Sequence, residues 1–93
     1  MICGFVDAEA ERIWLGEQSR QLPYDIQARA LMRFRMLDAA VELSDLRVPP
    51  SNRLHALTGG REGQHSISIN MQWRICFVWR DGGSYDVEIV DYH

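Results

Sequence analysis

The hydrophobic residues near the start of the chain change their spacing after residue 6. Residues 2–6 form a short apolar run that is typical of a strand. Asp7 follows this run and is a favourable N-cap, because its carboxylate can accept hydrogen bonds from the first backbone N–H groups of a helix. Gly16 is a suitable helix end. Between them, three apolar residues share one helical face: Ala10, Ile13 and Trp14. The pattern predicts a strand followed by a short helix.

A longer helix is predicted to begin near Pro23. Proline suits the first helical turn, where its missing N–H group would have no partner. Apolar residues then recur at steps of three or four and form one stripe: Ile26, Ala30, Phe34, Leu37 and Val41. Arg29, Arg33 and Asp38 lie off this stripe, so we expect their side chains to be solvated.

The spacing of hydrophobic residues changes to alternation after the proline pair at residues 49–50. Runs at residues 54–57, 66–69, 73–80 and 85–89 read as strands, and Asp81-Gly82-Gly83 is typical of a hairpin turn. The order is a strand, two helices and then a run of strands. The chain is therefore expected to be a single α+β domain over residues 1–93, with an N-terminal strand and two helices packed on one face of a small, mainly antiparallel sheet.

The composition limits the class of protein. No apolar run approaches the roughly 20 residues that cross a membrane, and the first residues do not resemble a signal peptide. We therefore expect a soluble, cytoplasmic protein without a membrane partner. Cys3 and Cys76 lie in apolar stretches and are expected to be buried free thiols. Without other clustered ligands they do not indicate a metal site, and nothing in the sequence calls for a cofactor.

Charge is distributed unevenly along the chain. The net charge is −3, which argues against a nucleic-acid partner. However, residues 47–80 contain five arginines and one glutamate, giving +4, whereas residues 1–46 sum to −3 and residues 81–93 to −4. All ten basic residues are arginine, which suits bidentate phosphate contacts, although an Arg-rich codon usage explains the absence of lysine equally well.

The residues that could do chemistry are imidazoles, guanidiniums and a phenol: His55, Arg61, Arg74, Tyr92 and His93. Serine-protease, metal-ligand and phosphate-loop spacings are missing from the sequence. Metal-free RNA cleavage needs a base for the ribose 2′-OH, an acid for the leaving 5′-oxygen and a cation for the phosphorane. Histidine and arginine can fill these roles. Taken alone, each residue also has a structural interpretation, as a surface histidine, a solvated strand arginine or a chain tail.

Several motifs in order resemble the HigB-type toxins of the RelE/ParE superfamily. They are LRVPPSNRL at 46–54, GREGQHSI at 60–67, QWRICF at 72–77 and VDYH at 90–93. The resemblance extends to residues 22–30 and so covers nearly the whole chain. It implies a RelE-like fold and a type II toxin that cleaves messenger RNA in the A site of the 70S ribosome. It also implies a HigA-type helix-turn-helix antitoxin as partner, with operator DNA contacted only through that antitoxin.

The resemblance also implies roles for individual residues. His93 is the best candidate for acid or base work, Tyr92 would orient or stack on the substrate, and Arg74 would hold the scissile phosphate. His55 would share proton transfer or bind phosphate. The expected substrate-binding residues are Arg53, Arg61 and Asp91, the last of which would also hold the geometry of the C-terminal residues.

Two departures keep other functions open. Thr58 stands where some relatives have lysine, and a neutral hydroxyl cannot supply that charge unless Arg61 compensates. The net charge of −3 is also unusual among these toxins, which tend to be basic. One alternative is a ParE-like inhibitor of DNA gyrase with no chemistry of its own, which the terminal Tyr92-His93 pair disfavours. Another is a degenerate toxin that acts only within an antitoxin–repressor complex, which Thr58 favours.

Overall fold

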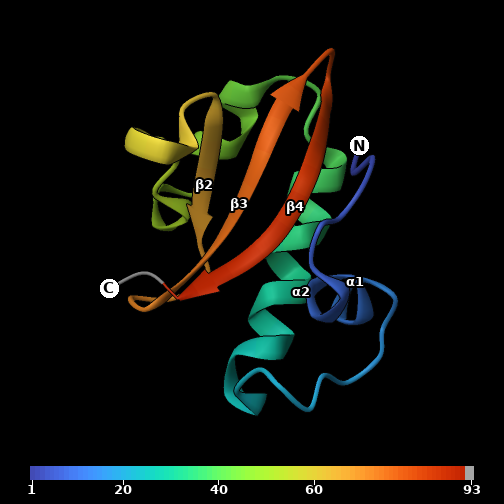
Figure 1. Cartoon of the computed structure of the whole chain (residues 1–93). Helices are drawn as coiled ribbons and strands as arrows, with labels where there is room; N and C mark the ends of the chain where they lie inside the picture. Colours follow the sequence, from blue (N-terminus) through green and yellow to red (C-terminus); the bar gives the residue numbers. More distant parts are fainter. Residues whose placement is uncertain (92–93) are drawn as a thin grey trace.

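The protein has a layer of helices on one face of an antiparallel sheet (Figure 1), as seen in a computed structural model that describes residues 1–91. The helices are α1 (Ala8–Trp14) and α2 (Tyr24–Ala39). The strands are β1 (His55–Ala56), β2 (Gln64–Ser68), β3 (Trp73–Arg80) and β4 (Gly83–Asp91). They lie in the sheet in chain order, each antiparallel to its neighbour. The expected α+β architecture is confirmed.

The two helices form where the apolar spacing indicates. Asp7 caps α1, accepting a hydrogen bond from the Glu9 backbone N–H at 3.0 Å. In α2 the predicted stripe is buried at its first four positions: Ile26, Ala30, Phe34 and Leu37. Val41 departs from the expectation: the helix ends at Ala39, the chain turns away at Ala40, and the Val41 side chain is 74% exposed.

The helix-facing side of the sheet forms the rest of the core. The residues on it are buried: Ile67, Ile69, Ile75, Phe77, Val87 and Ile89. Asp81 and Gly82 join β3 to β4 with φ values of 52° and 76°, the left-handed pair that matches the twist of a two-residue hairpin. The predicted hairpin is therefore confirmed. None of the helices in residues 1–91 is both long and apolar enough to cross a membrane.

The N-terminal segment runs beside β4 and parallel to it (Figure 1). The pairing consists of two isolated bridges, Ile2 with Ser84 and Phe5 with Val87, so the expected strand over residues 2–6 is only partly formed. The Cys3 backbone N–H donates to the Ser84 carbonyl at 2.7 Å. This segment covers part of the outer edge of β4. Of the two free cysteines, Cys76 is buried as expected, whereas Cys3 is exposed at the edge and contradicts the expectation.

Candidate active site

The sheet face opposite the helices carries the polar strand residues. Ser66 lies opposite Cys76, which lies opposite Glu88; Ser68 lies opposite Arg74. Because side chains alternate along a strand, these residues project away from the helix-facing residues Ile67 and Ile75. The register therefore turns a polar, arginine-bearing surface outward from the core.

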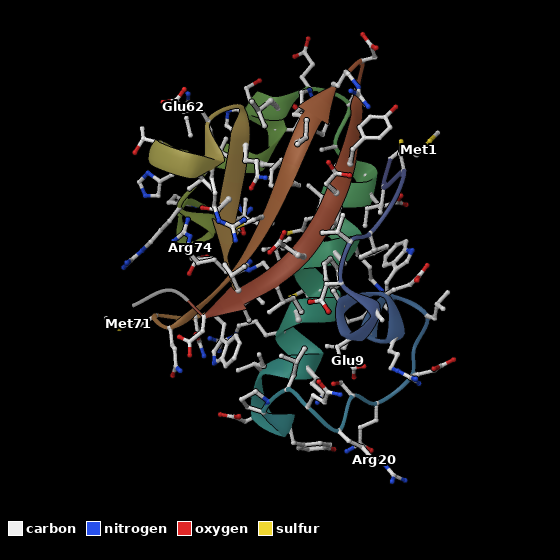
Figure 2. The ribbon with its side chains drawn as sticks, viewed as in Figure 1. Met1, Glu9, Arg20, Glu62, Met71 and Arg74 are labelled. Atoms are coloured by element: carbon white, nitrogen blue, oxygen red, sulfur yellow. The ribbon has the colours of Figure 1, made fainter. Side chains whose placement is uncertain are left out.

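Three hydrogen bonds to neutral oxygens help to hold Arg74 in place. Its side chain is buried, with only 7% of the residue exposed. Nε donates to the Ser66 hydroxyl at 2.8 Å, and Nη2 donates to the main-chain carbonyls of Arg53 at 2.6 Å and Ser66 at 3.4 Å. Figure 2 shows Arg74 on this side of the molecule, with Met71 at the turn between β2 and β3. These bonds fix the direction of the guanidinium.

Arg53 supplies one of those carbonyls from a strained backbone position. It follows the short 3-10 turn Pro50–Asn52 and has a left-handed φ of 47°. Such a conformation costs a residue with a side chain about 1–2 kcal/mol. The loop is anchored by Asn52, which is fully buried and whose Nδ2 donates to the Leu46 carbonyl at 3.1 Å. The proline-containing loop thus directs a carbonyl at Arg74 and leaves the Arg53 side chain exposed.

Three of the predicted site residues surround one hollow. We name this space of about 400 Å³ the catalytic hollow, after the role that we propose for it; its lining is Arg53, His55, Ala56, Leu57, Thr58, Met71 and Arg74. His55 is exposed on β1 and lies opposite Ser66 in the sheet. The lining contains two arginines and no carboxylate among the described residues, so the hollow favours an anion. Thr58 places its neutral hydroxyl in the same space.

The other predicted substrate-binding residues lie outside that lining. Arg61 donates from Nη1 to Gln64 Oε1 at 3.1 Å and forms a salt bridge with Glu88 at 3.3 Å. Glu88 therefore offsets its charge, and Arg61 does not replace a lysine within the catalytic hollow. Asp91 is exposed at the end of β4, where its Oδ2 accepts from Gln72 Nε2 at 3.2 Å. Tyr92 and His93 lie outside the described residues.

The buried thiol on this face is a poor nucleophile. Burial raises the pKa of Cys76; Glu88 adds to that effect, and the nearby Arg61 and Arg74 oppose it. A thiol with a raised pKa stays protonated near neutral pH and is a poor nucleophile. Cys76 is therefore a packing residue behind the arginines.

Sequence reasoning missed Ser66, Met71 and the environment of Arg33. Arg33 was expected in solvent, but only 9% of it is exposed, and its Nε donates to the Ser68 carbonyl at 3.1 Å. The alternation over residues 66–69 placed Ser66 and Ser68 on one face, but only the pairing register brings them to Arg74. The i, i+4 spacing of Arg29 and Arg33 was the available signal that these two arginines lie side by side on α2.

Comparison with known proteins agrees with this architecture. YafQ from E. coli and a point mutant of it superpose with TM-scores of 0.57 and 0.63 over 98% of this chain and 93% of theirs, at 11% and 10% identity. At that identity the likeness concerns the fold.

Two relatives are similar in sequence. Toxin HigB-1 of Vibrio cholerae is 41% identical over 66 residues, which is 71% of this chain and 70% of the relative. Endoribonuclease HigB of Proteus vulgaris is 38% identical over 61 residues, or 66% of this chain and 65% of the relative. A family model described as the RelE-like toxin HigB of type II toxin–antitoxin systems matches residues 4–93. The chain therefore belongs to the HigB family of RelE-like toxins of type II toxin–antitoxin systems.

Proposed function

We propose that this toxin is an endoribonuclease that cuts messenger RNA in the ribosomal A site by metal-free acid–base chemistry. The observation that carries the proposal is the geometry of Arg74. Its guanidinium is fixed by the Ser66 hydroxyl and the Arg53 carbonyl, and it lies with His55 around a hollow whose described lining holds no carboxylate. The relative from Proteus vulgaris carries the name endoribonuclease.

The reaction assigns each group a task. A base takes the proton from a ribose 2′-OH, the 2′-oxygen attacks the adjacent phosphorus, and the 5′-oxygen leaves with a proton from an acid. His93 and His55 would divide these proton transfers. Arg74 would stabilise the charge that builds on the phosphorane, and its fixed orientation avoids reorganisation during the reaction. Tyr92 would orient the substrate nucleotide at the cleavage site.

The remaining assigned residues support substrate binding. Arg53 lines the catalytic hollow and is exposed, so it can contact a phosphate directly. Arg61 would bind RNA only while sharing its charge with Glu88, which predicts a smaller contribution. Asp91 would hold the end of β4 against Gln72 and so help to position the residues that follow.

The family implies an antitoxin as partner. In our proposal that antitoxin is of the HigA type with a helix-turn-helix domain, and operator DNA is contacted only through it. The other partner is the 70S ribosome with its A-site messenger RNA, which places the toxin in the cytoplasm. Positioning of the substrate by the ribosome would compensate for the small basic area of the protein.

The test is primer extension on messenger RNA from cells that briefly express the wild type, Arg74→Ala, His93→Ala or Arg35→Ala. Arg35 is exposed on α2 and serves as a charge-matched control. We expect codon-phased cuts in the wild type and in the control. Loss of the phosphate-stabilising guanidinium should lower cutting about 100-fold or more, and loss of the acid–base group by a similar factor.

The other outcomes separate the alternatives. Growth arrest without new cuts would contradict the nuclease function and favour a ParE-like inhibitor of a target such as DNA gyrase. Neither arrest nor cuts, with folded protein present, would indicate a degenerate toxin that acts only in the repressor complex. Retained cutting by soluble His93→Ala would remove His93 from the catalytic set. Equal loss of cutting and of ribosome association in Arg74→Ala would make Arg74 a docking residue.

A further inference from the structure

A second hollow adjoins the catalytic hollow. It has a volume of about 230 Å³ and is bordered by three arginines, Arg29 and Arg33 from α2 and Arg53 from the loop before β1, together with Ser51 and Asn70. Arg53 and Met71 line both hollows, so the two spaces lie next to each other on the surface. We name this space the arginine hollow.

Arg33 is oriented into this region by neutral acceptors. Its Nε donates to the Ser68 carbonyl at 3.1 Å, and its Nη2 donates to the Ser51 hydroxyl at 3.4 Å. These bonds join α2 to β2 and to the proline-containing loop. They leave the positive charge without an acidic partner: within residues 1–91, no carboxylate lies within 4.0 Å of Arg29, Arg33 or Arg53.

The electrostatics of the arginine hollow are unfavourable without an anion. Burial lowers the pKa of Arg33, and the positive charge of Arg29, one helical turn earlier, lowers it further. Burying a charge beside a like charge costs free energy, which a bound anion would offset.

A structural role explains only part of the cluster. Arg33 links three elements through its hydrogen bonds, so packing alone could account for it. Arg29 is exposed and, within the described chain, has neither a side-chain hydrogen bond nor an ion pair, yet it lines the same hollow. Within residues 1–91, the charge of Arg29 is therefore not used by a hydrogen bond or an ion pair of the fold. A ligand with several anionic oxygens accounts for Arg29, since guanidinium groups pair with phosphate in a bidentate manner.

We propose that the arginine hollow binds a phosphodiester group of an RNA strand beside the catalytic hollow. This inference rests on the proposed function. The phosphate has two sources: a nucleotide of the messenger that flanks the cut, or the backbone of ribosomal RNA next to the A site. In either case Arg29 and Arg33 are binding residues for the polynucleotide, and Arg53 joins the two hollows.

The experiment compares Arg29→Ala with Arg35→Ala, a charge-matched change on the same helix at an exposed residue outside the arginine hollow. Two probes are titrated from 50 to 200 mM salt: a fluorescent five-nucleotide RNA with 2′-O-methyl groups, which cannot be cleaved, and programmed ribosomes with an empty A site. For the probe that occupies the arginine hollow, Arg29→Ala should weaken binding about tenfold. It should also make the slope of log K against log salt shallower by about 0.7 for a single strand.

Further measurements separate binding from folding. Alanine is well tolerated in a helix and relieves the repulsion on Arg33, so the thermal midpoint of Arg29→Ala should equal or exceed that of the wild type. Arg29→Lys keeps the charge and should restore the salt slope while recovering only part of the affinity. A fall in the thermal midpoint that matches the loss of RNA binding would make Arg29 structural and overturn the proposal.

The two probes give distinct results. Weaker binding of the oligonucleotide assigns the phosphate to the messenger, whereas weaker binding of ribosomes alone assigns it to ribosomal RNA. If Arg29→Ala and Arg35→Ala bind both probes equally well while the wild type cuts messenger RNA, the arginine hollow is not a phosphate site and the nuclease function stands. If the wild type neither binds these probes nor cuts, the proposed function fails and this inference fails with it.

Discussion

At the scale of single residues, main-chain carbonyls and serine hydroxyls help to orient two buried guanidiniums. Arg74 and Arg33 both donate to main-chain carbonyls and serine hydroxyls. Such acceptors satisfy the N–H groups that burial would otherwise leave unpaired, and they add no negative charge of their own. A carboxylate would hold the side chain as firmly but would compete with a phosphate for it. Neutral acceptors are therefore suited to an anion-binding surface.

Ser66→Ala tests this argument. Ser66 is fully buried and accepts from Arg74 Nε at 2.8 Å. Removing the hydroxyl leaves a buried donor without that partner, which costs about 1–3 kcal/mol of stability. Because the guanidinium also loses its orientation, kcat for RNA cleavage by programmed ribosomes should fall with little change in KM. Ser84→Ala is the control, because Ser84 is equally buried but bonds to the Met1 carbonyl. Equal loss of kcat in both variants would reduce Ser66 to a packing residue.

The sequence predicted which residues line the catalytic hollow, but it did not predict the hydrogen bonds that hold them there. Arg53, His55 and Arg74 were singled out and lie together, although their catalytic roles remain predictions. Arg33 was wrongly placed in solvent. Helical spacing identifies the stripe that faces the sheet, but it cannot show that a long side chain at the edge of that stripe reaches the end of β2. That contact depends on how α2 crosses the sheet.

At the scale of elements, the connection from α2 to β1 is held by local capping. The 3-10 helix η1 (Leu43–Arg47) begins with Asp45 Oδ2 accepting from the backbone N–H groups of Val41 and Glu42, each at 2.9 Å. The hydrogen bond from Glu42, followed by that from Val41, lowers the pKa of Asp45. η1 precedes the loop that positions Arg53, so this cap contributes to the site at a distance.

Asp45→Asn should therefore change the pH dependence of stability. A carboxylate whose pKa is lower in the folded state stabilises the protein above its unfolded pKa, about 3.9, and that stability is lost as the pH falls through the folded value. We expect the variant to be less stable than the wild type at pH 7, and the difference to shrink below about pH 4. Urea unfolding at pH 7 and pH 3 measures this. Glu62→Gln, at an exposed residue, is the control. A difference that stays constant with pH would contradict the assignment.

Elements with strong local signals were predictable, and short ones were not. The Asp81-Gly82 hairpin and α2 follow from turn chemistry and from a regular stripe, which need no distant partner. The expected strand over residues 54–57 contracts to His55–Ala56, and the one over residues 2–6 to isolated bridges. Both lie at sheet edges, where the extent of pairing depends on the neighbouring chain and not on the segment itself.

At the scale of the whole molecule, the two faces of the sheet have separate tasks. The face toward α2 supplies the core, and the opposite face carries Arg74 and the catalytic hollow. The net charge of −3 does not describe this second face, because charges separated by more than about 8–10 Å are largely screened at physiological salt. The two adjoining hollows, with arginines and no described carboxylate in their lining, set the local field that a phosphate meets.

The stability of the whole domain depends on Phe34, where three segments meet. It is fully buried, and its ring packs edge-on against Phe5 of the N-terminal segment at 5.6 Å and Trp14 of α1 at 6.4 Å between centroids. Phe34→Ala should cost about 3–5 kcal/mol. A domain has about 5–15 kcal/mol in total; at the lower end of this range the variant would keep only about 0–2 kcal/mol and have a measurable unfolded fraction at 37 °C.

Urea unfolding followed by circular dichroism measures the effect of Phe34→Ala, with Tyr24→Ala as the control. Tyr24 is on the same helix but is 77% exposed, so its loss should change stability by no more than about 0.5 kcal/mol. Growth inhibition by Phe34→Ala should fall in proportion to the folded fraction and recover on cooling. An active-site variant such as Arg74→Ala should stay folded and inactive at both temperatures. A Phe34→Ala protein with wild-type stability would show that the N-terminal segment and α1 do not depend on this ring for their packing.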